Sequence, residues 1–348
     1  MITILTAILV FGVIIAIHEF GHFAMAKLCG IKVNQFAIGM GPVILKKQKG
    51  ETEYSLRLFP IGGFCAMEGE DNQSSDTRSF HNKPVWQRML VVVAGAFMNL
   101  VLGFILILCT TLLYGDIITM EVAEFTENSQ TGQSCSTSET CGLQIGDKIL
   151  SMDGMRILTD TDLSYKLQNT ESDTMDLVVM RNGEKVKLPD VKFYNTETGN
   201  RLDFKVQAVE LTIWNITEYS FLNVISTSRL IWISLRDLIT GKFGFHDLSG
   251  PVGIIETIGE AASSGDNFKQ NLTSVLSFTS FITINIGICN LLPIPALDGA
   301  RFLFLLIEAI RRKPVSPERE GMVHFIGMAL MFLLMIVVTV QDISKLVQ

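Results

Sequence analysis

The stretch "AIHEFGHFAMAK", Ala16 to Lys27, joins the pattern His-Glu-x-x-His to a long apolar run, since residues 1–17 include no charged side chain. On a helix, His18 and His22 lie one turn apart, so their imidazoles project from one face and can share a metal ion. Glu19 follows about 100° round the same helix, within reach of a water molecule activated by that metal. The pattern predicts the metal site of a hydrolase, in a segment that otherwise suits lipid.

Two histidines at this spacing also occur where they only pack in a helix or contact lipid headgroups. Here the helix is apolar on every side, and a carboxylate such as Glu19 near the inner half of a membrane span is costly unless it has a function. These two observations favour a metal site over a packing role.

The composition indicates a membrane protein. Of 348 residues 48% are hydrophobic, and a net charge of -7 without blocks of basic residues argues against nucleic-acid binding. Crossing roughly 30 Å of hydrocarbon takes about 20 apolar residues. Four stretches are long enough, and the first lacks the basic start and cleavage pattern of a secretory signal, so we expect a retained span. The four are Ile2 to Ala26, Met89 to Tyr114, Leu272 to Leu292, and Met322 to Val340.

Charge predicts the orientation of these spans. The loops between spans one and two and between spans three and four are rich in Lys and Arg, which places both on the cytoplasmic side. Both termini and the acidic segment from Gly115 to about Gln270 then face outward. Residues 221–239 are apolar but interrupted by charges, which favours an interfacial amphipathic helix over a fifth span.

Local patterns predict two β-containing regions. Residues 33–64 combine β-favouring runs with glycines and a polar turn, so we expect one or two hairpins against the membrane. In the outer segment a short strand lies between Gly-Asp and Asp-Gly turns, Thr159 and Asp162 give a helix-capping signal, and Asn182-Gly183 marks a hairpin. Cys135 and Cys141 bracket a short outer loop and are candidates for a disulfide.

Two histidines alone do not make a catalytic zinc site, which uses three protein ligands and keeps one position open. The segment "NIGICNLLPIPALDGARF", residues 285–302, offers the third ligand, because Pro293 and Pro295 must break an apolar helix there. Free backbone at membrane depth is tolerated only where it is packed in protein or lines a cavity. Asp298 is therefore the candidate third ligand. Asp298 could also cap a helix that starts near Gly299, either instead of binding the metal or in addition to it, since the two roles are compatible.

Three features together resemble the site-2 protease family of intramembrane zinc metalloproteases, and most closely its bacterial regulator-of-sigma-factor type. These features are the motif His18-Glu19-Phe20-Gly21-His22, the motif Asn290-x-x-Pro293-x-Pro295-x-x-Asp298-Gly299, and a segment from Thr119 to Glu210 that resembles a PDZ domain through Gly142-Leu143-x-x-Gly146-Asp147-x-Ile149. "LSGPVGI", residues 248–254, and Gly95-x-x-x-Asn99 also match, although Ala96 replaces the usual proline.

The resemblance implies Zn²⁺ bound by His18, His22 and Asp298, with Glu19 as general base. It also implies substrates that are single transmembrane segments, such as anti-sigma factors or remnant signal peptides, already trimmed by another protease and held as extended strands along the membrane-embedded hairpin. Residues predicted to contact the substrate are Asn290, Asn99, Gly62 and Gly63, although both asparagines could equally join helices.

We therefore expect a polytopic α-helical membrane protein with about four transmembrane helices, a membrane-associated β-hairpin region and one extracytoplasmic PDZ-like α+β domain, in a bacterial cytoplasmic membrane. The expected divisions are 1–114, 115–215, 216–270 and 271–348. The PDZ-like module would act as a size filter or bind tails. A catalytically silent adaptor and a metal transporter are alternatives, which the intact Glu19 and the lack of repeats disfavour. His81, His246 and His324 are expected to be ordinary surface or packed histidines.

Overall fold

The computed structural model describes residues 2–347, apart from 71–73, 127–133, 135, 171, 195–201, 243 and 245–248. Its contacts divide the chain into two compact units, which are Met1–Leu106 with Ile231–Gln348, and Ile107–Leu230. Cys135 and His246 lie outside the described residues, so the disulfide between Cys135 and Cys141 stays a prediction.

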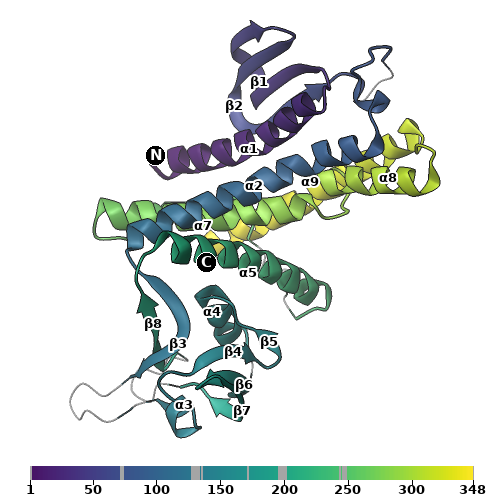
Figure 1. Cartoon of the computed structure of the whole chain (residues 1–348). Coiled ribbons are helices and arrows are strands. Elements are labelled where there is room, and N and C mark those ends of the chain that lie inside the picture. Colours follow the sequence, from purple (N-terminus) through teal and green to yellow (C-terminus); the bar gives the residue numbers. More distant parts are fainter. Residues whose placement is uncertain are drawn as a thin grey trace. The chain divides into compact units, whose positions relative to one another are not determined.

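Within the residues that the structure describes, four helices are long and apolar enough to cross a membrane, as the sequence predicted (Figure 1). Each extends a few residues beyond the expected span at one or both ends, because flanking polar residues continue the helical hydrogen bonding. The protein is accordingly a polytopic membrane protein. The four helices are α1 (Ile2–Leu28), α2 (Val85–Tyr114), α7 (Phe268–Asn290) and α9 (Pro317–Val347).

Small residues let the helices of the first unit approach one another closely. A Cβ atom added at Gly103 of α2 would lie 2.4 Å from Ile284 Cγ1 of α7, and a Cβ added at Gly21 of α1 would lie 2.3 Å from the carbonyl oxygen of Ala94 in α2. Such close backbone approach is a common device of helix packing in membranes. Both α1 and α7 therefore pack closely against α2.

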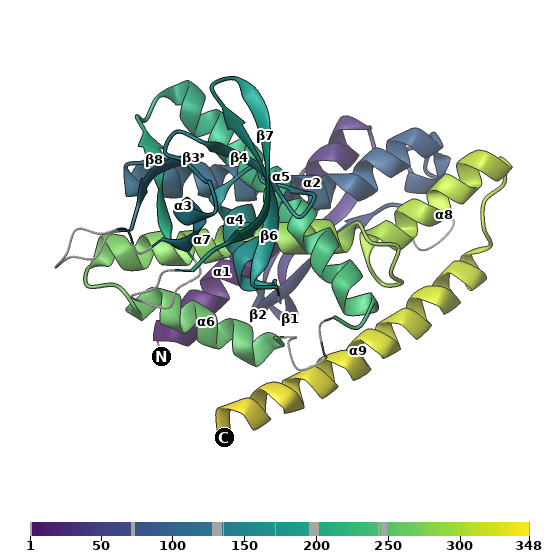
Figure 2. The same ribbon diagram turned by 90° about the horizontal axis from the view of Figure 1, so that it is seen from below.

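A shorter helix, α6 (Pro251–Ser263), packs on α1, α7 and α9 (Figure 2). Its first turn is held by the Asp342 carboxylate of α9, which accepts from the backbone N–H groups of Gly250 at 3.1 Å and Gly253 at 2.9 Å. A carboxylate at this position satisfies otherwise unpaired donors at a helix N-terminus. Helix α6 therefore joins α9 to the rest of the unit.

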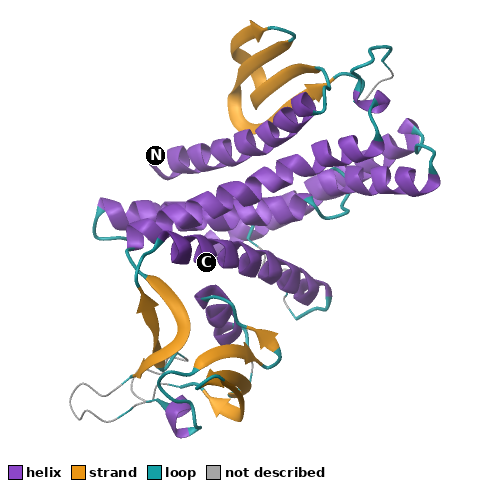
Figure 3. Ribbon diagram, viewed as in Figure 1, coloured by secondary structure: helices purple, strands orange, loops and turns teal. Residues whose placement is uncertain are grey.

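The first unit also carries one long antiparallel hairpin, formed by β1 (Val33–Lys49) and β2 (Thr52–Met67) (Figure 3). Its base packs on the C-terminal end of α1 in a core that includes Val33, Cys65 and Ala26. Farther out, Met40, Ile44 and Phe59 are all more than half exposed. Exposed apolar side chains on both strands suit the membrane-associated hairpin that the sequence predicted.

The second unit is built on a sheet with the strand order β7-β6-β4-β3-β8, and β5 pairs with β4. The helix and hairpin predicted here are present, since α4 starts after Thr159 and Asn182-Gly183 joins β6 to β7 with φ of 51° and 84°. Such positive φ values at both central residues suit a two-residue hairpin. The elements are β3 (Ile117–Phe125), α3 (Thr137–Thr140), β4 (Lys148–Met152), β5 (Met155–Arg156), α4 (Asp160–Gln168), β6 (Thr174–Arg181), β7 (Glu184–Lys192) and β8 (Phe204–Val209).

Residues 221–239 are helical, within α5 (Ile213–Ile239). This helix is not one of the four that could cross a membrane. Its position at the membrane interface stays a prediction. The first part of α5 contacts α4, because Ser226 Oγ donates to Asp162 Oδ2 at 2.8 Å and Tyr219 donates to Asp160 Oδ1 at 3.0 Å.

Candidate metal centre

Helix α1 places His18 and His22 on one face, as their spacing requires. Their Nε2 atoms are 3.2 Å apart, and the two ring planes meet at 82°. Because each ring presents the same nitrogen to the same point, the two can bind one ion.

Asp298 joins this pair from the helix break that the prolines predicted. Helix α7 ends at Asn290, and α8 (Asp298–Arg311) begins after the short connection. Asp298 Oδ2 lies 3.1 Å from His18 Nε2 and 3.3 Å from His22 Nε2. The alternative that Asp298 caps α8 is wrong, because Leu297 is the N-cap residue and Asp298 is already helical.

The three donor atoms suit zinc in kind and in spacing. They form a nearly equilateral triangle with edges of 3.2, 3.1 and 3.3 Å. Bonds of about 2.0–2.1 Å at tetrahedral angles would separate neighbouring zinc ligands by roughly 3.3–3.4 Å. Two imidazole nitrogens and one carboxylate oxygen form a ligand set that catalytic zinc sites use, with a fourth position left for water or substrate.

Each histidine has a second contact through its other nitrogen. His22 Nδ1 donates to the carbonyl oxygen of Val91 at 2.9 Å, which leaves Nε2 unprotonated and facing the triangle. Asn99 Nδ2 lies 3.3 Å from His18 Nδ1. Contacts of this kind fix the tautomer and the orientation of metal-binding imidazoles.

Gly95 leaves the space that the imidazoles occupy. A Cβ atom added there would lie 2.3 Å from His22 Nε2 and 2.9 Å from His18 Cε1. No side chain fits at this position without displacing a ring. The α2 backbone therefore forms one wall of the candidate metal centre.

Glu19 and the two histidines line one cavity of about 420 Å³ with Asp298. Residues 64–67, at the end of β2, also line this cavity. Gly63 brings that strand close, because a Cβ atom there would lie 3.1 Å from Glu19 Cγ. A peptide in this cavity would lie near both the end of β2 and the three donor atoms.

The other residues predicted to contact the substrate are not among the described residues that line this cavity. Gly62 adopts φ of 85° on β2 beside Met40, next to Gly63. Asn290 ends α7, and neither it nor Asn99 is among the described residues that line the cavity. Asn99 is fully buried against His18, so its position suits ring orientation better than contact with a substrate.

The sequence model of peptidase family M50 matches residues 6–334. The chain belongs to peptidase family M50. Its resemblance to the site-2 proteases is confirmed by this match and by curated relatives that align along the whole chain.

Three relatives show the extent of the similarity. The regulator of sigma-W protease RasP of Bacillus subtilis is 31% identical over an alignment with a length of 431, gaps included, which covers 99% of both chains. The zinc metalloprotease RasP of Shouchella clausii is 31% identical over 429 residues, again with 99% of both chains. A protein of Clostridium acetobutylicum, provisionally named a zinc metalloprotease, is 36% identical over 342 residues, covering 98% of this chain and 97% of its own.

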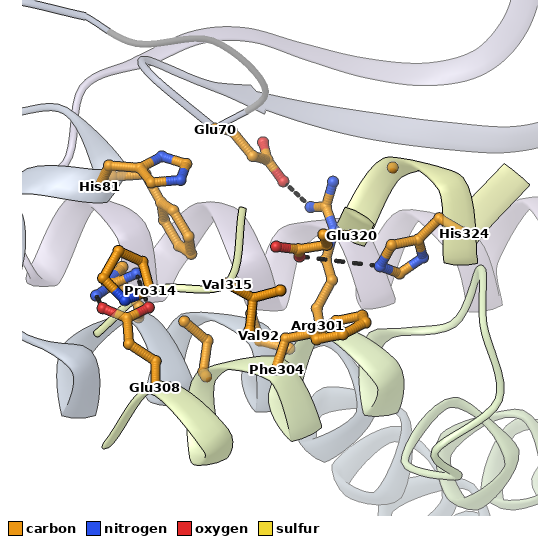
Figure 4. Close-up of a pocket in the computed structure, with 14 residues that line it drawn as sticks. Glu70, His81, Val92, Arg301, Phe304, Glu308, Pro314, Val315, Glu320 and His324 are labelled. Carbon is orange, nitrogen blue, oxygen red and sulfur yellow. Dashed lines mark hydrogen bonds and ion pairs between the residues drawn. The ribbon is translucent and has the colours of Figure 1, made fainter. Parts of the chain in front are cut away.

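In this M50 family member a second cavity of about 280 Å³ adjoins the first, and the two share Glu70, Val92 and Arg301 as lining residues. Arg301 lies one turn after Asp298 on α8 and forms an ion pair with Glu70, which follows the end of β2 (Figure 4). The pair ties the helix that carries Asp298 to the hairpin that faces Glu19. No sequence pattern predicted either residue as part of the site.

Proposed function

We propose that the chain is an intramembrane zinc endopeptidase in which His18, His22 and Asp298 hold the zinc ion and Glu19 is the general base. The proposal rests on the triangle of donor atoms described above, formed between an apolar helix and a proline-broken segment. Family membership makes the chain a zinc metalloprotease of the site-2 protease type. Beyond family membership, the proposal assigns a role to each of these residues.

Bound zinc would supply Lewis acidity, which polarises the carbonyl of the scissile bond and makes water a better nucleophile. Glu19 accepts a proton from water as the water oxygen bonds to the carbonyl carbon. It then donates that proton to the nitrogen that leaves when the carbon–nitrogen bond breaks. Val91 and Asn99 keep the imidazoles in place during these proton transfers.

The proposed substrates are single transmembrane segments. A peptide bond in a helix is enclosed by its own hydrogen bonds, so the segment must become extended before hydrolysis. The β2 strand, with Gly63 next to Glu19, offers a backbone against which an extended segment can pair. The Bacillus subtilis relative is named a regulator of sigma-W protease. For this chain, an anti-sigma factor or a remnant signal peptide is the corresponding proposal.

The second unit is proposed to act as a PDZ-like filter that admits substrates after removal of their outer domains. Its sheet, capped helix and Asn182-Gly183 hairpin support this assignment. The filter and both termini would lie outside the cytoplasmic membrane of a bacterium. The candidate metal centre would lie near the cytoplasmic side, as the Lys and Arg residues of the inner loops indicate.

The proposal is tested with the purified full chain in detergent. Zinc per chain is measured, and a panel of single-span model substrates is offered with and without a folded outer domain. Glu19→Gln should keep the zinc but lower the cleavage rate by about 10²–10⁴-fold. Glu184→Gln, an exposed residue of the second unit, is the matched control and should leave the rate unchanged.

The enzyme assignment and the filter role are each contradicted by a different result. Zinc bound without Glu19-dependent cleavage of any substrate would favour the silent adaptor. Equal cleavage of truncated substrates and of substrates with a folded outer domain would reject the filter while leaving the enzyme assignment intact.

A further inference from the structure

The connection between α7 and α8, which leads to Asp298, contains a backbone conformation that its surroundings must stabilise. Ala296, two residues before Asp298, has φ of 78°. This is the left-handed region, where a Cβ atom is unfavourable and glycine is the usual residue. A non-glycine residue stays in such a conformation only where its surroundings hold it.

Helix α9 supplies two contacts that hold this connection. The backbone N–H of Ala296 donates to Nδ1 of His324 at 3.0 Å. One turn later on the same face of α9, Gly327 packs closely against Pro295. A Cβ atom added at Gly327 would lie 2.1 Å from Pro295 Cβ and 2.9 Å from its carbonyl oxygen. The hydrogen bond holds Ala296 and the close approach holds Pro295. Helix α9 therefore contacts two adjacent residues of the connection in this backbone conformation.

The surroundings of His324 suit a fixed ring. Nδ1 can accept a hydrogen bond only when it carries no proton, so the proton of the neutral ring is on Nε2. Nε2 faces Glu320 Oε1 at 3.9 Å, and the ring centre lies 5.9 Å from that of Phe304 on α8 (Figure 4). The ring is thus packed between α8 and the connection, in agreement with the packed histidine that the sequence allowed, and it also accepts a backbone hydrogen bond.

We propose that His324 is a positioning residue for the metal centre. Its Nδ1 holds Ala296 in the left-handed conformation, and this conformation sets where the backbone presents Asp298 to the two imidazoles. Helix α9 thereby supports the third zinc ligand without contacting the metal. This inference rests on the proposed role of Asp298 as a zinc ligand.

The test replaces His324 with Leu, which still fills space beside Phe304 but has no hydrogen-bond acceptor. Zinc affinity and the rate of zinc release to a chelator are measured on the full chain in detergent, together with thermal unfolding. His324→Leu should weaken zinc binding by about tenfold, equivalent to about 1.4 kcal/mol and within the usual net value of one hydrogen bond. His324→Asn retains an acceptor and should stay within about threefold of the wild type, because its amide oxygen can replace Nδ1.

Ala296→Gly is the decisive second substitution. Glycine adopts a positive φ without support, so Ala296→Gly combined with His324→Leu should restore zinc affinity to within about threefold of the wild type. If His324→Leu alone does not fold, the double variant must fold and bind zinc.

Unchanged zinc release in His324→Leu would overturn the inference, and so would a double variant that is no better than the single one. A wild-type protein without zinc would instead reject the proposed function on which the inference rests. The two failures are therefore distinguishable.

Discussion

The candidate zinc ligand Asp298 and the buried carboxylates of the second unit have different neighbours. In the second unit, Asp147 accepts two hydrogen bonds from Arg181, at 2.7 and 2.6 Å, and one from the backbone N–H of Gln144 at 2.9 Å. Asp162 pairs with Arg229 at 2.7 Å and accepts from the Ser226 hydroxyl. In the first unit, Asp298 faces two imidazole nitrogens.

This difference separates a structural carboxylate from a candidate ligand. An arginine or a backbone N–H supplies its own proton, so it completes the hydrogen bonding of a buried carboxylate. The His22 ring already donates its Nδ1 proton to Val91, which leaves Nε2 and Asp298 Oδ2 both as acceptors in the neutral state. Two acceptors 3.3 Å apart are best joined by a cation.

The largest expected effect comes from filling the space beside the imidazoles. Gly95→Ala should weaken zinc binding by at least the 10–100-fold typical of disturbed contacts around metal ligands, since the new Cβ would lie 2.3 Å from His22 Nε2. Gly103→Ala on the same helix is the control. It crowds Ile284 and should reduce stability by about 1–3 kcal/mol without altering zinc per folded chain. Equal zinc affinity in both variants would contradict the predicted geometry.

Removal of a structural carboxylate should lower stability and leave zinc binding unchanged. Asp147 is fully buried, so Asp147→Ala should lower the free energy of unfolding of the second unit by about 3 kcal/mol because Arg181 loses its partner. Zinc content should not change. The exposed pair of Glu124 and Lys205 provides the control, and Glu124→Ala should cost less than about 1 kcal/mol. Limited proteolysis and thermal unfolding measure the stability of both variants. Loss of zinc in Asp147→Ala would contradict the distinction between structural carboxylates and the candidate ligand.

The smallest expected effect is a change of folding stability with pH, caused by Asp160. Burial raises the pKa of Asp160 above its usual value, and the hydrogen bond from Tyr219 offsets only part of this. The folded state therefore binds this proton more tightly than the unfolded state does. Its contribution to stability is full below the unfolded pKa and is lost as pH rises through the folded pKa.

Asp160→Asn mimics the protonated form, so at neutral pH it should be more stable than the wild type by less than about 1 kcal/mol. The difference should vanish in acid. A difference independent of pH, measured by thermal unfolding at several pH values, would show that Asp160 is not the group that titrates.

Much of the candidate metal centre could be predicted from sequence because its chemistry is local. The spacing of His18 and His22 fixes their common face on any helix, and Pro293 and Pro295 force a break wherever they fall in an apolar run. The Asn182-Gly183 hairpin and the capped helix after Thr159 were predictable for the same reason.

Contacts that depend on how helices pack were not predictable. Val91 takes part through its carbonyl oxygen, a group that every residue has, so its side chain gives no signal. For Asn99 the sequence left substrate contact and a helix-joining role open, and its contact with His18 depends on how α2 packs on α1. His324 has a partner only because α9 returns to the connection before Asp298, and no local pattern indicates that return.

The central claim, that His18, His22 and Asp298 bind one zinc ion, is tested most directly by zinc X-ray absorption on the purified chain and on Asp298→Ala. We predict one zinc per wild-type chain, a shell of nitrogen and oxygen atoms at about 2.0–2.1 Å with the scattering of two imidazoles, and loss of zinc or of one oxygen ligand in the variant. Cys65 lines the same cavity, so a sulfur atom at about 2.3 Å would contradict this ligand set. An identical spectrum in Asp298→Ala would contradict it equally.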